Sequence, residues 1–573
     1  MDRLSQARKV FLSLIFTFIS LSLVLANQSG PEDKTKEVDK LFAALDKTTS
    51  PGAALAIIKD GEIIYTRGYG MAKLEDDLVM TPSKIFDIGS VSKQFTATCI
   101  AILALEGKLS LDDDVRKYIP ELPTYERPIT IRHLLHHTSG LRDYNALLSL
   151  AGFRPDSDCP TVEESLEIIC RQKKLNHPPG EEYSYTNTGY FLLGLIVERV
   201  SGKSLNQFAQ ERIFRPLDMK NTFFQDNHNQ IIKNRASGYS PEGDGFRLNL
   251  SNWDEVGDGN VYTTVEDLYL WDQAFYNHRL GRQLMELLHT QGILNNGQKI
   301  DYAFGLIIGH YRGLKTISHS GSWAGFRASL IRFPDEKFSI ICLSNLSTFN
   351  PAAVSYKIAD IYLADKFKEE IKKEKLQEFK PYPLTEKELQ EKCGNYKEIK
   401  FSQWLTISLE KDNLKASIGR QQLVLTPLGP TSFQTLLGDS LVRFEFGRDE
   451  KGQISLSVTG IGREKYTFIK AAPLPPFSPA ALKEYEGFYQ SYELLGAIYQ
   501  IILDKENNLK IKFRNAPKEP LKAMAPDEFT AEGLNFTFLR GKNKKVNSLA
   551  LSVGRAANIM FRKLEKNEAP RFP

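Results

Sequence analysis

The C-terminal third of the chain repeats itself, and this repeat limits the folds that the chain can adopt. LQEKCGNY at residues 389 to 396 matches LKEYEGFY at residues 482 to 489, with leucine, glutamate, glycine and tyrosine in corresponding places 93 residues apart. Each copy is followed by short segments in which apolar and polar residues alternate, as in half-buried β-strands. The repeat predicts two consecutive β-barrels of about eight strands each. One long β-sandwich is the alternative interpretation.

The N-terminal two thirds have a different pattern. Residues 53 to 59 and 62 to 70 are β-rich and flank Asp60-Gly61, a turn dipeptide typical of a hairpin. Residues 110 to 290 have mostly helical patterns, and apolar strands return in YAFGLIIGHY, GLKTISHSG and FRASLIRFPDEKFSIICLSN. A hairpin at one end and strands at the other predict one α+β domain whose sheet is closed by sequence-distant strands.

These patterns also set the expected domain boundaries. Residues 351 to 379 are expected to form a long helix with a highly charged second half, which ends at Pro381 and Pro383. Residues 471 to 479 contain AAPLPPFSP, a stiff linker between the repeats. The predicted units are a signal peptide at 1–26, the α+β domain at 35–365, a charged helix and linker at 366–383, the first barrel at 384–470, the Pro-rich linker at 471–479 and the second barrel at 480–565.

The first 26 residues predict export. Arg3, Arg8 and Lys9 precede the apolar run VFLSLIFTFISLSLVLA, which ends on small residues. We therefore expect a periplasmic or secreted protein, or a membrane-anchored one if this segment is retained, and association with the cell envelope stays open. The formal net charge of +4 is close to balance for 573 residues and argues against a nucleic-acid partner.

The five cysteines are expected to be free thiols. Cys99 and Cys342 lie in apolar stretches. Cys159 and Cys170 are separated by a helix that opens at the capping box of Thr161, and that helix would hold their Cα atoms roughly 12 Å apart. A disulfide tolerates only about 7 Å.

The segment FDIGSVSKQF places Ser90 and Lys93 at the start of a predicted helix. Residues three apart share a helix face, so the serine hydroxyl and the lysine amine can form the nucleophile and base pair of covalent catalysis. In the alternative interpretation, Ser90 only caps the helix and Lys93 is a solvated charge.

Two later segments bear on this pair. Tyr185-Thr186-Asn187 precedes an apolar helix, and Asn187 alone could be a helix cap. His319-Ser320-Gly321-Ser322 follows a predicted strand, and alone it could be a glycine-containing strand end.

In this order, S-x-x-K, Y-x-N and H-x-G resemble the three motifs of the serine β-lactamase and penicillin-binding family. The Y-x-N form is similar to the class C β-lactamase, D-Ala-D-Ala carboxypeptidase and D-aminopeptidase branch. The resemblance covers about residues 35 to 365 and implies a β-lactamase/transpeptidase-like domain: an antiparallel sheet flanked by helices, plus a helical subdomain. The two barrels resemble the lipocalin-like domains appended to D-aminopeptidase-like enzymes.

The resemblance also implies residue roles. Ser90 would form an acyl-enzyme, with either Lys93 or Tyr185 as its base. Asn187 would position the lysine and the substrate amide, and His319 and Gly321 would bind substrate. The backbone N–H groups of Ser90 and Ser322 would form the oxyanion hole.

His319 departs from the family, because most β-lactamases have a lysine there. A histidine is mostly neutral above its ordinary pKa of about 6.5, so recognition of a β-lactam carboxylate by a fixed charge is weakened. We expect a hydrolase of a D-aminoacyl peptide, a peptidoglycan-derived peptide or a small ester, with faster turnover of an ester or D-aminoacyl amide than of a cephalosporin. The alternatives are a true β-lactamase or D-Ala-D-Ala carboxypeptidase, and a non-catalytic protein that binds penicillin or peptidoglycan.

No metal or cofactor is expected. His133 and His137 have a metal-ligand spacing, but the glutamate of an H-E-x-x-H zinc site is missing, so packing or capping roles are expected. The barrels contain no ordered catalytic set, and we expect them to shape substrate access or hold the enzyme to another surface. The expected partner is a small-molecule or peptide acyl substrate, and the oligomeric state stays open.

Overall fold

The computed structural model describes residues 31–154, 157–368, 382–399, 403–418, 421–437, 440–460, 465–474, 477–514, 517–565 and 567–568. The predicted signal peptide lies outside these ranges. Within them, every helix is too short or too polar to cross a membrane.

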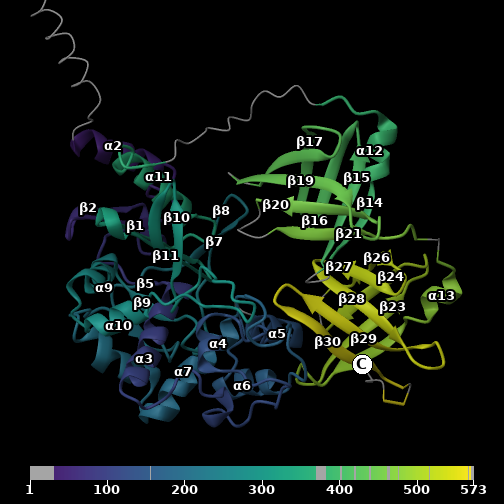
Figure 1. The fold of residues 1–573 in the computed structure, drawn as a ribbon, viewed down its shortest axis with the longest axis horizontal. Helices are drawn as coiled ribbons and strands as arrows, with labels where there is room; N and C mark the ends of the chain where they lie inside the picture. Colours follow the sequence, from purple (N-terminus) through teal and green to yellow (C-terminus); the bar gives the residue numbers. More distant parts are fainter. Residues whose placement is uncertain are drawn as a thin grey trace, which may run out of the picture.

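The N-terminal domain is built on a six-stranded antiparallel sheet (Figure 1). The predicted hairpin is confirmed, with Asp60 at a φ of 51° and Gly61 at 88° in its turn. Strand β1 also pairs with β13, from Ala53 opposite Ser344 to Lys59 opposite Phe338, so sequence-distant strands close the sheet as expected. In spatial order the strands are β10 (Ile307–Tyr311), β11 (Leu314–Trp323), β12 (Phe326–Phe333), β13 (Phe338–Ser344), β1 (Ala53–Lys59) and β2 (Glu62–Tyr69).

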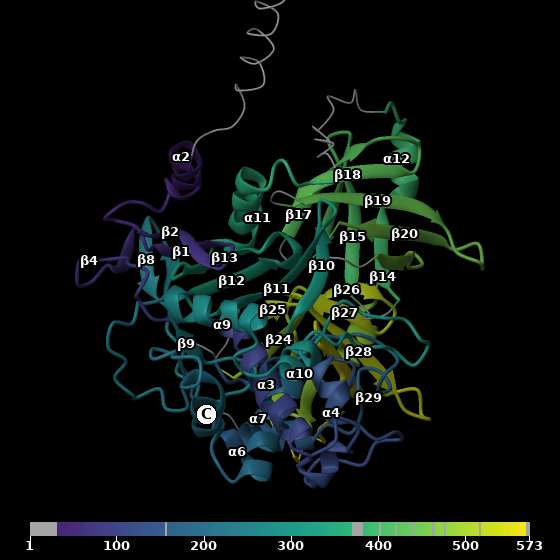
Figure 2. The same ribbon diagram turned by 60° about the vertical axis from the view of Figure 1, so that its left-hand side comes forward.

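Both faces of this sheet are covered, because successive residues of β1 point to opposite sides. Leu55 belongs to a cluster with helices α2 (Pro31–Phe42) and α11 (Pro351–Tyr362). Its neighbour Ala56 belongs to the large core that includes α9 (Val265–Asn277). In Figure 2, α2 and α11 lie on one side of the sheet and α9 on the other.

The helical part of the domain lies between the sheet strands in sequence, as expected. Helix α6 opens with the predicted capping box of Thr161 and Glu164, and all five cysteines are free. The other elements are α3 (Lys93–Leu105), α4 (Ile131–Leu135), α5 (Tyr144–Ala151), α6 (Val162–Cys170), α7 (Asn187–Ser201), α8 (Leu205–Ala209), α10 (Arg282–Leu287), the 3₁₀ helices Gly89–Ser92, Val115–Lys117 and Pro334–Glu336, the π-helical turn Gln210–Phe214, and short strands β3 (Met71–Lys73), β4 (Leu78–Val79), β5 (Phe86–Asp87), β6 (Phe223–Phe224), β7 (Tyr239–Glu242), β8 (Gly245–Leu248) and β9 (Val261–Thr263).

The long helix expected over residues 351 to 379 is wrong in its length. Helix α11 ends at Tyr362, and the chain then turns. The turn is held because the Arg312 guanidinium lies over the Phe367 ring, 4.0 Å from its centroid, and the Lys368 N–H donates to the Arg312 carbonyl. Residues 369–381 of the predicted charged segment lie outside the described residues.

The first repeat is a closed eight-stranded barrel, so the two-barrel interpretation is confirmed over the sandwich. The helix α12 (Glu386–Lys392) precedes it. Its strands are β14 (Gly394–Glu398), β15 (Trp404–Glu410), β16 (Asn413–Ile418), β17 (Gln421–Pro427), β18 (Ser432–Leu437), β19 (Ser440–Arg448), β20 (Ile454–Thr459) and β21 (Tyr466–Lys470).

The second repeat has nine strands in one curved sheet, and its end strands β25 and β26 do not pair with each other. The second barrel is therefore nearly closed. It follows helix α13 (Pro479–Lys483), and its strands are β22 (Gly487–Ser491), β23 (Ala497–Leu503), β24 (Leu509–Phe513), β25 (Glu519–Pro520), β26 (Lys522–Ala525), β27 (Glu528–Ala531), β28 (Leu534–Arg540), β29 (Val546–Val553) and β30 (Ala556–Lys563).

The repeated glycine and tyrosine have the same function in both copies. Gly394 and Gly487 both have a φ of 144°, which favours glycine. Tyr396 and Tyr489 are fully buried, and each hydroxyl donates to a backbone carbonyl four residues earlier. The motif thus fixes the first strand of each barrel against its preceding helix.

The two barrels differ in their relation to the N-terminal domain. The first barrel has a separate hydrophobic core. The second barrel shares one continuous cluster of buried residues with the N-terminal domain, and in Figure 1 it lies beside α5. The Tyr499 hydroxyl donates to the Leu150 carbonyl of α5 at 2.9 Å. Docking of the second barrel therefore brings its loops close to the predicted site.

Candidate active site

Ser90 lies in the 3₁₀ turn that leads into α3, where the sequence placed it. The backbone of β11 lies directly against this turn. A Cβ added to Gly321 would lie 1.9 Å from the Ile88 carbonyl oxygen and 3.2 Å from the Ser90 nitrogen, and one added to Gly89 would lie 2.7 Å from the Ser322 nitrogen. Both glycines are therefore required for the backbone N–H groups of Ser90 and Ser322 to lie side by side.

Lys93 is fully buried, and its ammonium donates three hydrogen bonds. The acceptors are Ser90 Oγ at 3.1 Å, Asn187 Oδ1 at 2.9 Å and the Asp258 carbonyl oxygen at 2.6 Å. Burial lowers the pKa of Lys93 to about 8. A neutral amine keeps two N–H groups, and the Asn187 and Asp258 oxygens can only accept. Its lone pair is therefore directed to Ser90, which can donate its hydroxyl proton.

Tyr185 lies beside this pair, with its ring centroid 5.0 Å from Lys93 Nζ. Its hydroxyl is buried and interacts with Ser90, although no described residue partners it at standard hydrogen-bond geometry. Burial raises the pKa of Tyr185, which favours the neutral phenol as a proton donor over the phenolate as a base. The ring packs on His137 at 4.1 Å between centroids, and His137 Nδ1 accepts the Thr186 N–H.

Asn187 is the first residue of α7, and its side chain does not cap that helix. Its Oδ1 accepts from Lys93, and its backbone N–H donates to Asp143 Oδ2 at 2.7 Å. The capping interpretation of Asn187 is therefore wrong, because the side chain is directed to the lysine.

His319 lies on β11 and is held as a neutral imidazole. Its Nδ1 lies 2.7 Å from the Ser320 carbonyl oxygen, which can only accept, so Nδ1 carries the proton. Its Nε2 then accepts from the Tyr302 hydroxyl at 3.0 Å. Burial lowers the pKa of His319 to about 4. His319 is thus uncharged near neutral pH, as the sequence indicated.

The second barrel supplies a cation that sequence reasoning missed. The guanidinium of Arg555 lies over Tyr185, with Cζ 4.9 Å from the ring centroid. Arg555 lies in the turn between β29 and β30, and only the docking of the barrel brings this turn to the site.

A small pocket of about 40 Å³ opens beside Ser90. By the usual measure it holds about three water-sized groups. Glu255 in its wall is 3% exposed; its Oε1 accepts from Ser165, and its Oε2 has no hydrogen-bond partner among the described residues. Burial raises the pKa of Glu255 to about 7. The lining residues are Gly89, Ser90, Tyr144, Asn145, Asn187, Trp253, Glu255, Asp258, Gly259, Asn260, Ser322 and Trp323.

A larger groove of about 620 Å³ begins at His319, on another side of the site. Tyr183 and Tyr302 line it, together with Tyr356 of α11 and Tyr466 of the first barrel. The site therefore combines a small pocket with a long aromatic groove.

The two histidines with metal-ligand spacing have structural roles. His133 Nδ1 accepts the Thr130 N–H in the capping box of α4, and His137 supports the Tyr185 loop. In the described part of the chain, the one group of metal-type side chains is formed instead by Cys159, His228 and Asp254.

The geometry can perform acyl transfer. A serine hydroxyl contacts a buried amine of lowered pKa, a phenol lies beside both, and the backbone segments that carry the Ser90 and Ser322 N–H groups lie against each other. The fold and this arrangement define a serine hydrolase of the penicillin-recognising type.

A family comparison agrees with this class. The model described as "Beta-lactamase" matches residues 38–363, and the chain belongs to this family.

The chain is 31% identical over 336 residues to Penicillin-binding protein 4* of Bacillus subtilis. The aligned region covers 55% of this chain and 72% of that protein. It is 30% identical over 329 residues to a D-aminopeptidase of Brucella anthropi, and this alignment covers 56% of this chain and 61% of that protein. Among solved structures, the octameric penicillin-binding protein homologue of Pyrococcus abyssi has a TM-score of 0.54 and 28% identity, over 76% of this chain and all of that one.

Proposed function

We propose that this serine hydrolase removes a small N-terminal aminoacyl group from short peptides, or from related amides and esters. The proposal depends mainly on Glu255, whose side chain lines the small pocket beside Ser90 and whose buried Oε2 has no hydrogen-bond partner among the described residues. A buried carboxylate oxygen without a hydrogen-bond partner is costly, and a substrate ammonium in the pocket would stabilise the carboxylate with a charge-assisted hydrogen bond.

The sizes of the two cavities support the same substrate. A pocket of about 40 Å³ has room for a methyl and an ammonium group, whereas the groove of about 620 Å³ can accept the rest of a peptide. The relatives named D-aminopeptidase support a D configuration for the aminoacyl group.

The roles of the motif residues follow. Lys93 takes the hydroxyl proton as Ser90 attacks the carbonyl carbon, and the Ser90 and Ser322 N–H groups hold the oxyanion. Tyr185 would donate its proton to the leaving nitrogen and recover a proton from the Lys93 ammonium, so that both groups return to their starting states. Asn187 fixes Lys93, and Gly321 allows β11 to approach. His319 and Tyr302 lie where the groove begins and would contact the leaving peptide.

Glu255→Gln tests the proposal with D-alanyl p-nitroanilide and its N-acetyl analogue. The wild type should prefer the free amine, and the variant should lose about 10- to 100-fold in kcat/KM for that substrate, since hydrogen bonds to charged groups are worth this much. The acetylated substrate should change little. Because Glu255 must be ionised, the preference should rise with pH through about 7, until the substrate ammonium itself deprotonates.

Glu242→Gln, at the exposed end of β7, is the matched control and should behave as wild type. A chromogenic cephalosporin tests the β-lactamase alternative. If the wild type hydrolyses it better than D-alanyl p-nitroanilide, or if Glu255→Gln leaves the amine preference intact, the proposed function is wrong.

A further inference from the structure

The β29–β30 hairpin of the second barrel is clamped to the N-terminal domain at its turn. The Arg555 carbonyl accepts the Asp143 N–H at 3.2 Å and the Asn176 Nδ2 group at 2.9 Å. On the next strand, the Ala557 N–H donates to Asn176 Oδ1 at 3.1 Å. The backbone of Arg555 is therefore held by the same residue, Asp143, that binds the backbone of Asn187.

The side chain of Arg555 is held only loosely. Its nearest carboxylate oxygen, Asp143 Oδ2, lies 3.8 Å away, which is longer than a direct hydrogen bond. The guanidinium carbon lies over the Tyr185 ring, and half of the side chain is exposed. Arginine has five N–H donors, so donors remain beside Tyr185 that a ligand can reach.

The two groups next to Ser90 that could carry a positive charge are not open to a ligand in this way, although Lys299 is exposed in the wall of the groove. The three N–H groups of Lys93 are already used, and His319 is neutral. Arg555 is a permanent charge whose planar fork matches a carboxylate. The expectation of a cleft without a fixed cation, drawn from His319 alone, therefore does not hold for the whole chain.

We infer that Arg555 is a substrate-binding residue contributed by the second barrel, and that it selects substrates with a carboxylate or a similar anion near the scissile bond. This inference rests on the proposed hydrolysis at Ser90. Together with Glu255, it assigns short zwitterionic peptides as the preferred substrate class.

Two matched pairs test the inference in the full chain. The first pair is D-alanyl-glycine and its carboxamide, in which the anion of the charged member lies on the leaving group. The second pair is the 4-nitrophenyl monoester of adipic acid and its methyl ester, in which the anion of the charged member lies on the acyl group. For at least one pair, Arg555→Gln should lower kcat/KM of the anionic member by about 10- to 100-fold, mainly through KM. The neutral member should change less than about twofold, and Arg555→Lys should recover part of the loss.

Arg514→Gln is the matched control, because Arg514 contacts the Gly152 carbonyl in the same interface and not the site. An equal loss for both members of each pair, or no loss, would overturn the inference. Calorimetric binding of the same pairs to Ser90→Ala chains separates the two proposals. If neither pair is hydrolysed but Arg555 still makes the anionic member of a pair bind more tightly than the neutral member, the proposed function fails and the role of Arg555 stands.

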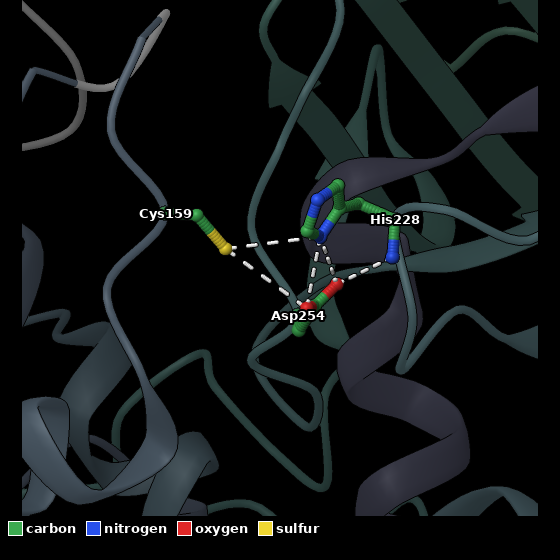
Figure 3. Close-up of side chains that lie close together, drawn as sticks. All are labelled: Cys159, His228 and Asp254. Carbon is green, nitrogen blue, oxygen red and sulfur yellow. Dashed lines mark hydrogen bonds and ion pairs between the residues drawn. The ribbon is translucent and has the colours of Figure 1, made fainter.

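A second group of side chains lies outside the catalytic machinery. Cys159 precedes α6, His228 follows β6 and Asp254 precedes β9, and Figure 3 shows the three side chains directed at one another. His228 Nδ1 lies 3.7 Å from Cys159 Sγ and 2.9 Å from Asp254 Oδ2, and Sγ lies 3.9 Å from the same carboxylate oxygen.

These residues do not form a nucleophilic triad. Cys159 and Asp254 both approach the same nitrogen, Nδ1, so the imidazole cannot relay a proton between them (Figure 3). Burial and the Asp254 charge also raise the pKa of the Cys159 thiol, which opposes formation of a free thiolate.

The geometry points to a three-ligand site for a divalent cation of the zinc class. With Zn–S near 2.3 Å and Zn–N and Zn–O near 2.0 to 2.2 Å, a tetrahedral ion separates its ligand atoms by about 3.3 to 3.6 Å, close to the spacing here. His228 and Asp254 are about one third exposed, so water can complete the coordination. Asp254 adjoins Trp253 and Glu255 of the small pocket, so the cation would brace the loop that forms it.

Zinc titration of the chelator-stripped full chain by calorimetry tests the site. One equivalent should bind, with release of the thiol proton and tighter binding at higher pH. Co²⁺ should give a thiolate charge-transfer band. Cys159→Ser and Asp254→Asn should lose this equivalent, whereas Cys170→Ser, the matched control, should keep it. Binding weaker than about 0.1 mM, or binding that survives Cys159→Ser, would overturn the inference.

Discussion

Lys93→Ala is expected to slow acylation of Ser90 by about 10²- to 10⁴-fold, the usual contribution of a general base. The measurement is the rate of labelling by a fluorophosphonate, with the adduct mapped to Ser90 by mass spectrometry. The reason is the arrangement around Nζ: two fixed acceptors take the N–H groups of the neutral amine and leave its lone pair for the serine.

The pH dependence separates Lys93 from Tyr185. Burial lowers the pKa of Lys93 to about 8, so the fraction of neutral amine, and with it the acylation rate, should rise as pH increases through about 8. The pKa of Tyr185 is raised, so a phenolate base would give a rise only at much higher pH.

Lys108→Ala, in the exposed turn that follows the same helix, is the control and should acylate as the wild type does. If Lys93→Ala kept the wild-type rate, or if Tyr185→Phe alone removed the pH-dependent rise, Lys93 would not be the base.

The motif residues could be predicted because their chemistry depends on local structure. The Ser90 and Lys93 spacing needs only a helix start, and Gly89 and Gly321 need only a close approach of two backbones. The same holds for the barrel repeat, since Gly394 and Gly487 mark the same backbone conformation in two places.

Glu255 and Arg555 could not be predicted, because their roles depend on contacts between distant segments. Glu255 resembles any acidic loop residue until burial leaves one of its oxygens without a partner in the described part of the chain. Arg555 lies in an ordinary hairpin turn, and only the docked barrel places it 4.9 Å from the Tyr185 ring centroid. The length of α11 was missed for the same reason, since Arg312 and Phe367 hold the turn that follows it.

One buried ion pair contributes to the docking of the second barrel, beside the shared hydrophobic core. Glu493 Oε1 accepts from Arg142 at 2.9 Å, and the two side chains are 5% and 1% exposed. The Glu493 carboxylate also accepts the N–H groups of Lys173 and Met560, and its carbonyl accepts from Gln172. This one residue thus links α6 and the loops beside it to the barrel strand that follows Arg555.

Glu493→Ala is therefore expected to destabilise the docked barrel by about 3 to 5 kcal/mol, the usual cost of leaving one partner of a buried ion pair alone. Arg142 would remain buried without a counter-charge, so the domains should separate and the Arg555 hairpin should leave the site. Hydrogen exchange should then increase across the β29–β30 hairpin. Turnover of the carboxylate substrates should fall as in Arg555→Gln, while fluorophosphonate labelling of Ser90 continues.

Glu486→Ala, which changes an exposed residue of the same barrel, is the control. If Glu493→Ala kept wild-type exchange and the preference for anionic substrates, the ion pair would not hold the barrel at the active site.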